Sequence, residues 1–309
     1  MTIEKTPRIT VGLPIYNGQK YLEKSIQSIL SQTLKDFELI IIDNNSSDDT
    51  DKICREYSKR DARIRYYQND SNIGASANHN KTLDMARGEY FVWASYDDIR
   101  HPDYLMRCSA ELDKTNEVSV CHCLTRYIDA DGNETSRQET QLELGVQSPS
   151  IRFKEMSRMD HKVEMILGLM RTDMMKKTKG LGPFSDSDRV LMAEMALYGP
   201  FVVLPEYLFY RREHAENSSK VYKSRQSRMA WFDPKLKGKI SFPHFRQFRE
   251  YMASISRVPL SSEDRIKCNV VMMTWLFHNK DRLQRDLIHS FRTLVIKTLF
   301  FLKLRSQNH

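Results

Sequence analysis

The first hundred residues alternate short apolar runs with segments whose apolar side chains recur at helical spacing. The apolar runs predict β-strands at residues 8–15, 37–42, 64–67 and 90–94. Helices are predicted between them, over 18–32, around Cys54, and from the turn at Gly74 to about 86. Strands that alternate with helices form right-handed βαβ units. This order therefore predicts an α/β fold with a mostly parallel, doubly wound sheet flanked by helices.

The strand expected at residues 90–94 runs almost directly into two neighbouring carboxylates, Asp97 and Asp98. Apolar strands of this kind build parallel sheets that are buried on both faces, and ligands bind beyond the carboxyl ends of such strands. Two carboxylates held close together there need a compensating cation. The pair therefore predicts Mn²⁺ or Mg²⁺, together with an anionic ligand such as a diphosphate.

Composition places the chain among ordinary globular proteins. At 309 residues it can bury a large core in one or two domains, and 40% hydrophobic and 28% charged residues are typical of soluble proteins. Its five cysteines include no Cys-x-x-Cys pair, which favours reduced thiols in a cytoplasmic setting. The first residues lack the apolar core of a signal peptide, and no uncharged apolar stretch is long enough to cross a bilayer.

The formal net charge of +8 calls for a partner. The sequence contains no helix-turn-helix, zinc-finger or aromatic RNA-binding pattern, so nucleic acid is not expected. Basic residues become denser in the last third of the chain, which suits a phosphate ligand and an anionic membrane surface.

After residue 115 the pattern changes. A hairpin is predicted around the turn at 129–133, from strands at 118–128 and from 134 onward, whereas 145–160 shows no clear pattern. Further on, helices are predicted at 161–177 and 187–198, and short strands at 201–204 and 207–210. From about residue 216 the sequence is basic and helical.

Polar residues follow the first three predicted strands. After the first, Tyr16 offers a face on which a nucleobase could stack and Asn17 an amide to read its edge, although an ordinary turn with Asn17 as helix cap explains them equally well. After the second, Asp43 could accept a base N–H or simply belong to a capping cluster. After the third, backbone N–H groups near Gly74 could approach a phosphate.

Taken in order, these motifs resemble the family 2 glycosyltransferases, which have the GT-A fold. The motifs are Pro14-x-Tyr16-Asn17, Asp43-Asn-x-Ser46, Asn72-x-Gly74, Gly88-Glu89-Tyr90 and Asp97-Asp98. The resemblance covers about residues 8–215. It implies a GT-A domain over 1–215, with a nucleotide half to about 115 and an acceptor half from about 116, followed by a basic helical region over 216–309.

The resemblance also implies roles for single residues in donor binding. It puts the nucleoside beside Pro14, Tyr16, Asp43 and Asn45, and the ribose and diphosphate beside Asn72, Gly74 and Asn78. In the acidic motif many members carry an acid where this chain has Ser95. Metal binding is therefore expected at Asp98, with Asp97 contacting the ribose or a metal-bound water.

In the second half the resemblance points to Asp188 as the general base of an inverting enzyme, because it lies at the first turn of the helix predicted before Gly199. A helix cap is the alternative role, and Asp186 competes for either one. After the last predicted strand, Arg212 is expected to offset charge on the leaving diphosphate, and His214 to bind the metal or a phosphate.

Residues 283–305 form an amphipathic helical pattern with basic residues along its edge. The pattern predicts a helix that either lies in the plane of a membrane or docks on the catalytic domain.

The sequence therefore predicts a metal-dependent, inverting glycosyltransferase that moves a sugar from a nucleotide-diphosphate sugar to a glycan or lipid-linked acceptor in cell-surface glycan or polysaccharide synthesis. We expect it in the cytoplasm or at the inner face of the membrane. The alternative is a degenerate transferase fold that acts as a nucleotide-binding scaffold or sensor, for which Ser95 is the main sequence support.

Overall fold

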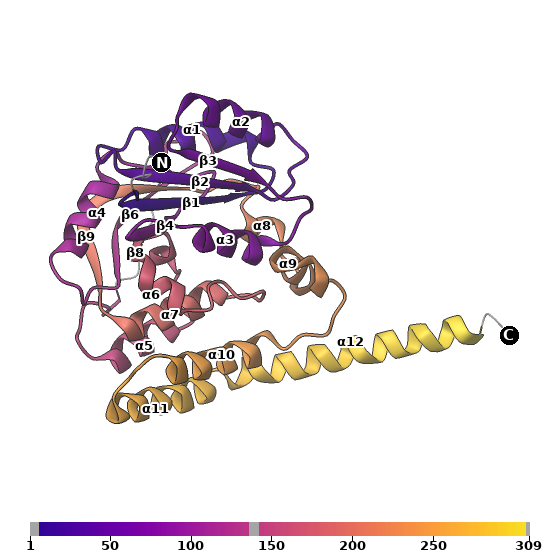
Figure 1. Cartoon of the computed structure of the whole chain (residues 1–309). Helices are drawn as coiled ribbons and strands as arrows, with labels where there is room; N and C mark the ends of the chain where they lie inside the picture. Colours follow the sequence, from indigo (N-terminus) through magenta and orange to yellow (C-terminus); the bar gives the residue numbers. More distant parts are fainter. Residues whose placement is uncertain (1–5, 136–141, 307–309) are drawn as a thin grey trace.

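The structure, a computed structural model, describes residues 6–135 and 142–306, and within these the strands form one nine-stranded mixed sheet flanked by helices (Figure 1). Its strand order is β3-β2-β1-β4-β8-β6-β9-β5, and β7 pairs with β6. The sheet confirms the predicted α/β class, and its carboxyl edge carries the acidic motif.

The first four strands are parallel, as predicted. They are β1 (Ile9–Ile15), β2 (Phe37–Asp43), β3 (Ile64–Gln68) and β4 (Tyr90–Trp93). Every residue of β1, β2 and β4 is buried, because helices cover both faces. Helices α1 (Gln19–Leu30) and α2 (Thr50–Arg60) lie on one face and α3 (Ala75–Asp84) on the other (Figure 1).

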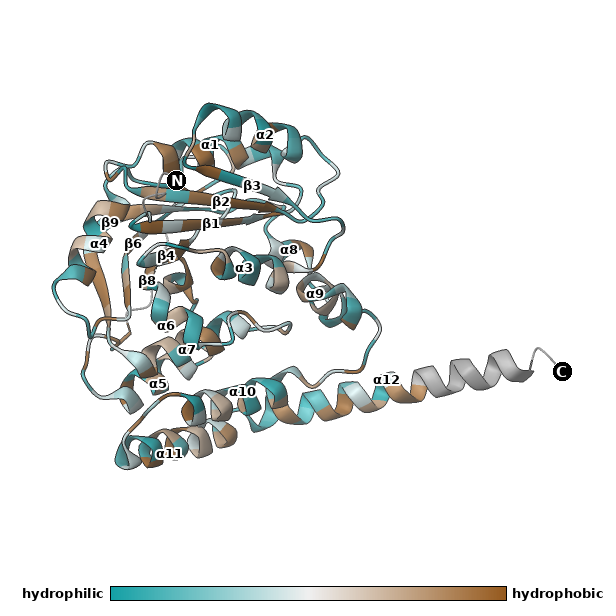
Figure 2. Ribbon diagram, viewed as in Figure 1, coloured by the Kyte–Doolittle hydropathy of each residue, from teal (hydrophilic) through white to brown (hydrophobic). Residues whose placement is uncertain are grey.

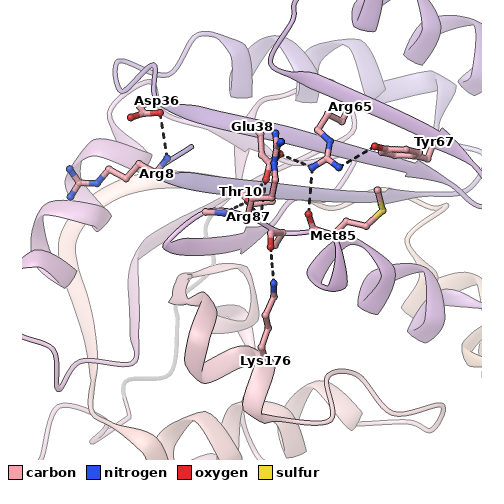
Figure 3. Close-up of polar contacts among 11 residues, drawn as sticks. Arg8, Thr10, Asp36, Glu38, Arg65, Tyr67, Met85, Arg87 and Lys176 are labelled. Carbon is pink, nitrogen blue, oxygen red and sulfur yellow. Dashed lines mark hydrogen bonds and ion pairs between the residues drawn. The ribbon is translucent and has the colours of Figure 1, made fainter. Parts of the chain in front are cut away.

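A buried carboxylate ties the amino end of this sheet together (Figure 3). Glu38 on β2 accepts hydrogen bonds from Thr10 Oγ1 (2.7 Å), Arg65 Nη1 (2.8 Å) and Arg87 Nη2 (2.9 Å). Burial opposes ionisation, but these donors keep the pKa of Glu38 below its usual range. The network lies at the edge opposite the acidic motif and fixes the strands that carry the site.

The second half adds antiparallel pairings to the sheet. Its elements are β5 (Ile99–Arg100), α4 (Tyr104–Asp113), β6 (Val120–Ile128), β7 (Glu134–Thr135), α5 (Pro149–Ser157), the 3₁₀ helix η1 (Glu164–Leu167), β8 (Leu169–Arg171), α6 (Thr172–Lys177), α7 (Ser187–Tyr198) and β9 (Phe201–Arg212). The predicted hairpin is confirmed up to Thr135, beyond which its second arm lies outside the described residues.

The helix predicted over residues 161–177 is wrong. The chain forms η1, β8 and α6 there, and β8 pairs with both β4 and β6. Leu169 and Met170 are fully buried because β8 fills the space between those two strands. Pairing with distant strands therefore outweighs the local helical spacing.

Two further differences have local causes. Residues 149–157 form α5, which carries few apolar residues and so gave no clear pattern. The two strands predicted at 201–204 and 207–210 are one strand, β9, whose register against β6 shifts near Pro205. Proline lacks the N–H that a ladder needs, so the strand is interrupted but not ended there.

The C-terminal region is helical, as predicted. It contains α8 (Ser218–Val221), α9 (Arg225–Phe232), the 3₁₀ helix η2 (Pro234–Leu236), α10 (Pro243–Arg257), α11 (Ser262–His278) and α12 (Lys280–Ser306). Helices α10 and α11 pack against α5 and α7, and their residues Tyr251, Met272 and Trp275 belong to the same hydrophobic core. Among the helices that the structure describes, none combines the length and apolarity that crossing a membrane requires.

Candidate active site

The acidic motif lies in the loop between β4 and β5, at the carboxyl edge of the sheet. Asp97 and Asp98 are only 7% and 5% exposed. The Ser95 hydroxyl donates a hydrogen bond to Asp97 Oδ1, and the backbone N–H of Arg212 donates to Asp98 Oδ1 at 2.8 Å. The two carboxylates thus face different neighbours, although they are adjacent in sequence.

His214, just after β9, pairs with Asp97. Its Nε2 lies 2.8 Å from Asp97 Oδ2, and Asn217 Nδ2 donates to the same oxygen at 3.2 Å. The imidazole is buried beside the Tyr21 ring, with centroids 4.7 Å apart. Among the described residues nothing bonds to His214 Nδ1. Asp97 and His214, which are 117 positions apart in the sequence, therefore lie in contact at the carboxyl edge of the sheet.

Electrostatics at this point favour a cation. Burial, and then the charge of Asp97, raise the pKa of Asp98 well above its usual range, because a second negative charge in the buried pocket is costly. Within the described part of the chain, no cluster of three or more histidine, cysteine, aspartate or glutamate side chains could hold a metal alone. Asp97 supplies a carboxylate, the ligand type that Mg²⁺ and Mn²⁺ prefer, and His214 places an imidazole beside it.

Arg212 holds the acidic loop in place. Its buried guanidinium donates to the backbone carbonyls of Asp97 (2.9 Å), Asp129 (3.0 Å) and Ala130 (3.2 Å). Its charge lies over the ring of Tyr21, 4.9 Å from the centroid. The structure therefore directs this side chain toward backbone oxygens around the motif. Its neighbour Arg211 is more exposed and forms an ion pair with Glu164.

The loops after β1 and β2 are joined by Asn17. Its Oδ1 accepts from the Ser47 N–H at 2.9 Å, and its own N–H donates to Ser46 Oγ at 2.8 Å. Asn17 and Asn45 both have positive φ, 50° and 64°, a region that asparagine tolerates better than most residues. These two predicted site residues therefore shape the loops, and Pro14 lies inside β1, three residues before Asn17.

Two residues of the predicted nucleoside pocket differ in exposure. Tyr16 is 39% exposed, so its ring is open to a ligand. Asp43 is fully buried, and it accepts hydrogen bonds from the Ser46 N–H at 3.0 Å and from Gln68 Nε2 at 3.1 Å.

The turn before α3 meets the C-terminal region. Gly74 has a φ of 89°, and a Cβ atom there would lie 2.5 Å from the carbonyl oxygen of Phe232. Asn72 Oδ1 accepts from the Gly74 N–H at 2.9 Å, which closes the turn. Asn78 is buried, and its amide bonds to Asn69 and to the Ile42 carbonyl, so it supports the turn from within the protein.

Asp188 lies in the first turn of α7, as predicted. Burial, and then the nearby charge of Asp186, raise the pKa of Asp188. Asp186 precedes the helix in the left-handed conformation, with a φ of 63°. Arg189, which directly follows Asp188, is buried and donates to the His161 carbonyl at 2.6 Å, which anchors the start of the helix.

Two residues of α3 hold the loop that leads to Asp188. Asn80 forms two hydrogen bonds with the backbone of Leu181, at 2.8 and 2.9 Å, and Ser76 Oγ donates to the Gly182 carbonyl at 2.8 Å. Sequence reasoning missed this contact, since the partners are about 100 residues apart. The polar positions on α3 were the only available signal.

The chain is similar to known proteins both in sequence and in structure. The model of Glycosyl transferase family 2 matches residues 10–174, just over half of the chain. An uncharacterized glycosyltransferase of Methanocaldococcus jannaschii is 35% identical over 129 residues, which cover 41% of this chain and 44% of that protein. Chondroitin synthase of Escherichia coli is 32% identical over 133 residues, or 43% and 19% of the two chains.

A third relative is the GalNAc(5)-diNAcBac-PP-undecaprenol beta-1,3-glucosyltransferase of Campylobacter jejuni. It is 42% identical over 93 residues, which cover 30% of each chain. The match thus spans less than half the length of each of these three relatives.

Two solved structures share the fold. Residues 1–349 of S. aureus TarS, in complex with UDP-GlcNAc, superpose with a TM-score of 0.66 at 16% identity, covering 93% of this chain and 81% of that one. The mannosyltransferase PcManGT from Pyrobaculum calidifontis, in complex with GDP-Man and Mn²⁺, gives a TM-score of 0.51 at 15% identity, covering 96% and 88%. At these identities the likeness shows the fold alone.

Proposed function

The chain belongs to glycosyltransferase family 2 and is a glycosyltransferase with the GT-A fold, and we propose that it transfers a sugar from a nucleotide-diphosphate sugar to an acceptor hydroxyl with inversion. The observation that carries this proposal is the contact between Asp97 and His214 at the carboxyl edge of the sheet. Ligands bind at this edge in α/β sheets of this kind.

The donor would lie across the loops that follow β1, β2 and β3. The exposed ring of Tyr16 supports stacking of the base, and the turn at Gly74 brings backbone N–H groups to the start of α3, where a helix N-terminus favours anions. The solved neighbours carry UDP-GlcNAc and GDP-Man, so uracil and guanine are the first bases to test.

Asp97 and His214 would hold Mn²⁺ or Mg²⁺ together with the donor diphosphate. This proposal moves the metal ligand from Asp98, the residue expected from the resemblance, to Asp97, because Asp97 is the carboxylate that contacts His214. A bound cation would neutralise charge on the departing diphosphate. Arg212 would keep the acidic loop in position through its bonds to the backbone.

Asp188 would take the proton from the acceptor hydroxyl as the new glycosidic bond forms. A raised pKa makes a carboxylate a stronger base near neutral pH, which supports this role. The acceptor would be a glycan or a lipid-linked glycan, since relatives include a chondroitin synthase and an enzyme named for an undecaprenol diphosphate acceptor.

Calorimetric titration with UDP-, GDP- and dTDP-sugars, with Mn²⁺ or with EDTA, tests the site. We expect one donor to bind at least about tenfold tighter with Mn²⁺, since each metal–diphosphate contact adds charge-assisted binding. His214→Ala and Asp97→Asn should remove that gain. His244→Ala is the matched control, because His244 also pairs with an aspartate, Asp286, but in the C-terminal region.

Two results would contradict the proposal. A full Mn²⁺ gain in both site variants would remove these residues from metal binding. Tight donor binding by the wild type, without donor turnover in the presence of Mn²⁺ and glycan or lipid-linked acceptors, would instead favour the nucleotide-binding scaffold.

A further inference from the structure

Helix α11 has an apolar face that no other described part of the chain covers. Four large side chains are 59–69% exposed and recur at helical spacing. They are Ile266, Val270, Met273 and Phe277. The opposite face of the same helix is buried against the domain through Cys268, Met272 and Trp275. A helix that is apolar on both sides needs a second apolar environment, because large exposed apolar surfaces are unfavourable in water.

Helix α12 carries a second exposed apolar face. It starts two residues after α11, and five of its apolar side chains are 39–67% exposed. They are Leu287, Ile288, Phe291, Leu294 and Val295. The buried side of α12 packs through Asp286, which accepts from the His244 N–H at 2.8 Å, and Ser290. Figure 1 shows α12 running away from the body of the molecule, and Figure 2 shows apolar residues along its first half. These nine residues are called the outer stripe.

The charge of α12 identifies the partner. From residue 287 to 306 the sequence contains four basic residues and no acidic one. Eight of the eleven residues from 294 to 304 are apolar. Apolar side chains beside unopposed cations match a bilayer surface, where acyl chains take up the apolar groups and lipid phosphates meet the charges. A second copy of this helix would bring only like charges to the same segment.

We propose that the outer stripe docks on an anionic phospholipid bilayer, with α11 and α12 lying in its plane. Docking would also orient the catalytic domain. Arg257 of α10 binds Glu194 of α7 through two nitrogens, at 2.6 and 2.8 Å, and Trp275 Nε1 donates to the Ser157 carbonyl at 3.1 Å. Helix α7, whose first turn contains Asp188, is therefore joined to α10, which packs against α11 and α12.

Vesicle flotation tests this surface without any need for turnover. The full chain is mixed with vesicles of phosphatidylcholine alone, or with vesicles that also contain about 30% of the anionic lipid phosphatidylglycerol. We expect the wild type to float with the anionic vesicles. The double variant Phe277→Asp, Phe291→Asp should bind about tenfold more weakly or worse, because it loses two phenylalanines that would enter the bilayer.

The matched control is Met106→Asp, Val203→Asp. It also replaces two exposed apolar residues by aspartate, so it changes net charge equally, but it lies on α4 and β9. This variant should float like the wild type. Three results would overturn the proposal: no flotation of the wild type, equal loss in both variants, or a dimer that only the stripe variant disrupts while vesicles stay unbound.

Discussion

Asp188 carries its carboxyl in surroundings that favour the protonated form. Burial and the charge of Asp186 raise its pKa in the folded chain, whereas the unfolded chain leaves it near its usual value of about 3.8. The residue proposed as the base should therefore weaken folding at neutral pH, as strained functional groups often do.

This cost can be measured with Asp188→Asn. Below a pH of about 3.8 the carboxyl is protonated in both states, so wild type and variant should melt alike. As pH rises through the folded pKa, the wild type should lose stability relative to the variant, and the difference should then level off. Melting curves between about pH 3 and 8 check this, with the exposed Asp84→Asn as control.

The same variant should lose about 10²- to 10⁴-fold in turnover and keep its donor affinity. A melting difference that does not change with pH would show that Asp188 is not perturbed, and near-normal turnover would remove its role as base.

Sequence reasoning found both acids of the motif but could not say which one meets His214. That choice depends on the backbone of Arg212, because its N–H donates a hydrogen bond to Asp98, whereas Asp97 contacts the imidazole of His214. Loop conformation of this kind is not encoded by residue spacing.

At the scale of elements, the contact between α3 and the loop before α7 joins the donor half to the proposed base. Asn80 holds Leu181 by two hydrogen bonds, so its loss should let the start of α7 shift. We expect Asn80→Ala to lower turnover by about tenfold to 100-fold, because small displacements of a reacting group are costly.

Donor affinity should change little in Asn80→Ala, so the effect would appear in kcat and not in KM for the donor. Asn116→Ala, at an exposed asparagine, serves as the control. A fall in donor affinity with unchanged kcat would show that Asn80 serves the donor site alone.

Which elements could be predicted depended on whether their pattern is local. Strands β1, β2 and β4 are fully buried apolar runs and β3 is rich in aromatic residues, so all four were predicted to within one residue at each end. Strand β8 was missed because only its neighbours β4 and β6 make a strand of Leu169–Arg171.

At the scale of the whole molecule, the C-terminal helices share a core with the catalytic domain. Trp275, only 5% exposed, packs with Tyr251 at 5.9 Å between ring centroids, and both belong to the core that includes α7. The change of composition near residue 216 therefore does not mark the end of the packed core.

Trp275→Ala should lower the free energy of unfolding of the whole chain by about 3–5 kcal/mol, because it leaves a large cavity. Phe277→Ala is a matched control on the same helix, since Phe277 is 69% exposed and its loss should cost about 0.5 kcal/mol or less. Denaturant titration should show one transition for both. Two separate transitions, with only one moved by Trp275→Ala, would contradict the shared core.

The close approach of Gly74 to the Phe232 carbonyl restricts position 74 to glycine when donor specificity is engineered. Even a methyl group at position 74 would collide with backbone, so this position offers no side-chain diversity to a library. Randomisation is better directed at Tyr16, whose side chain is 39% exposed.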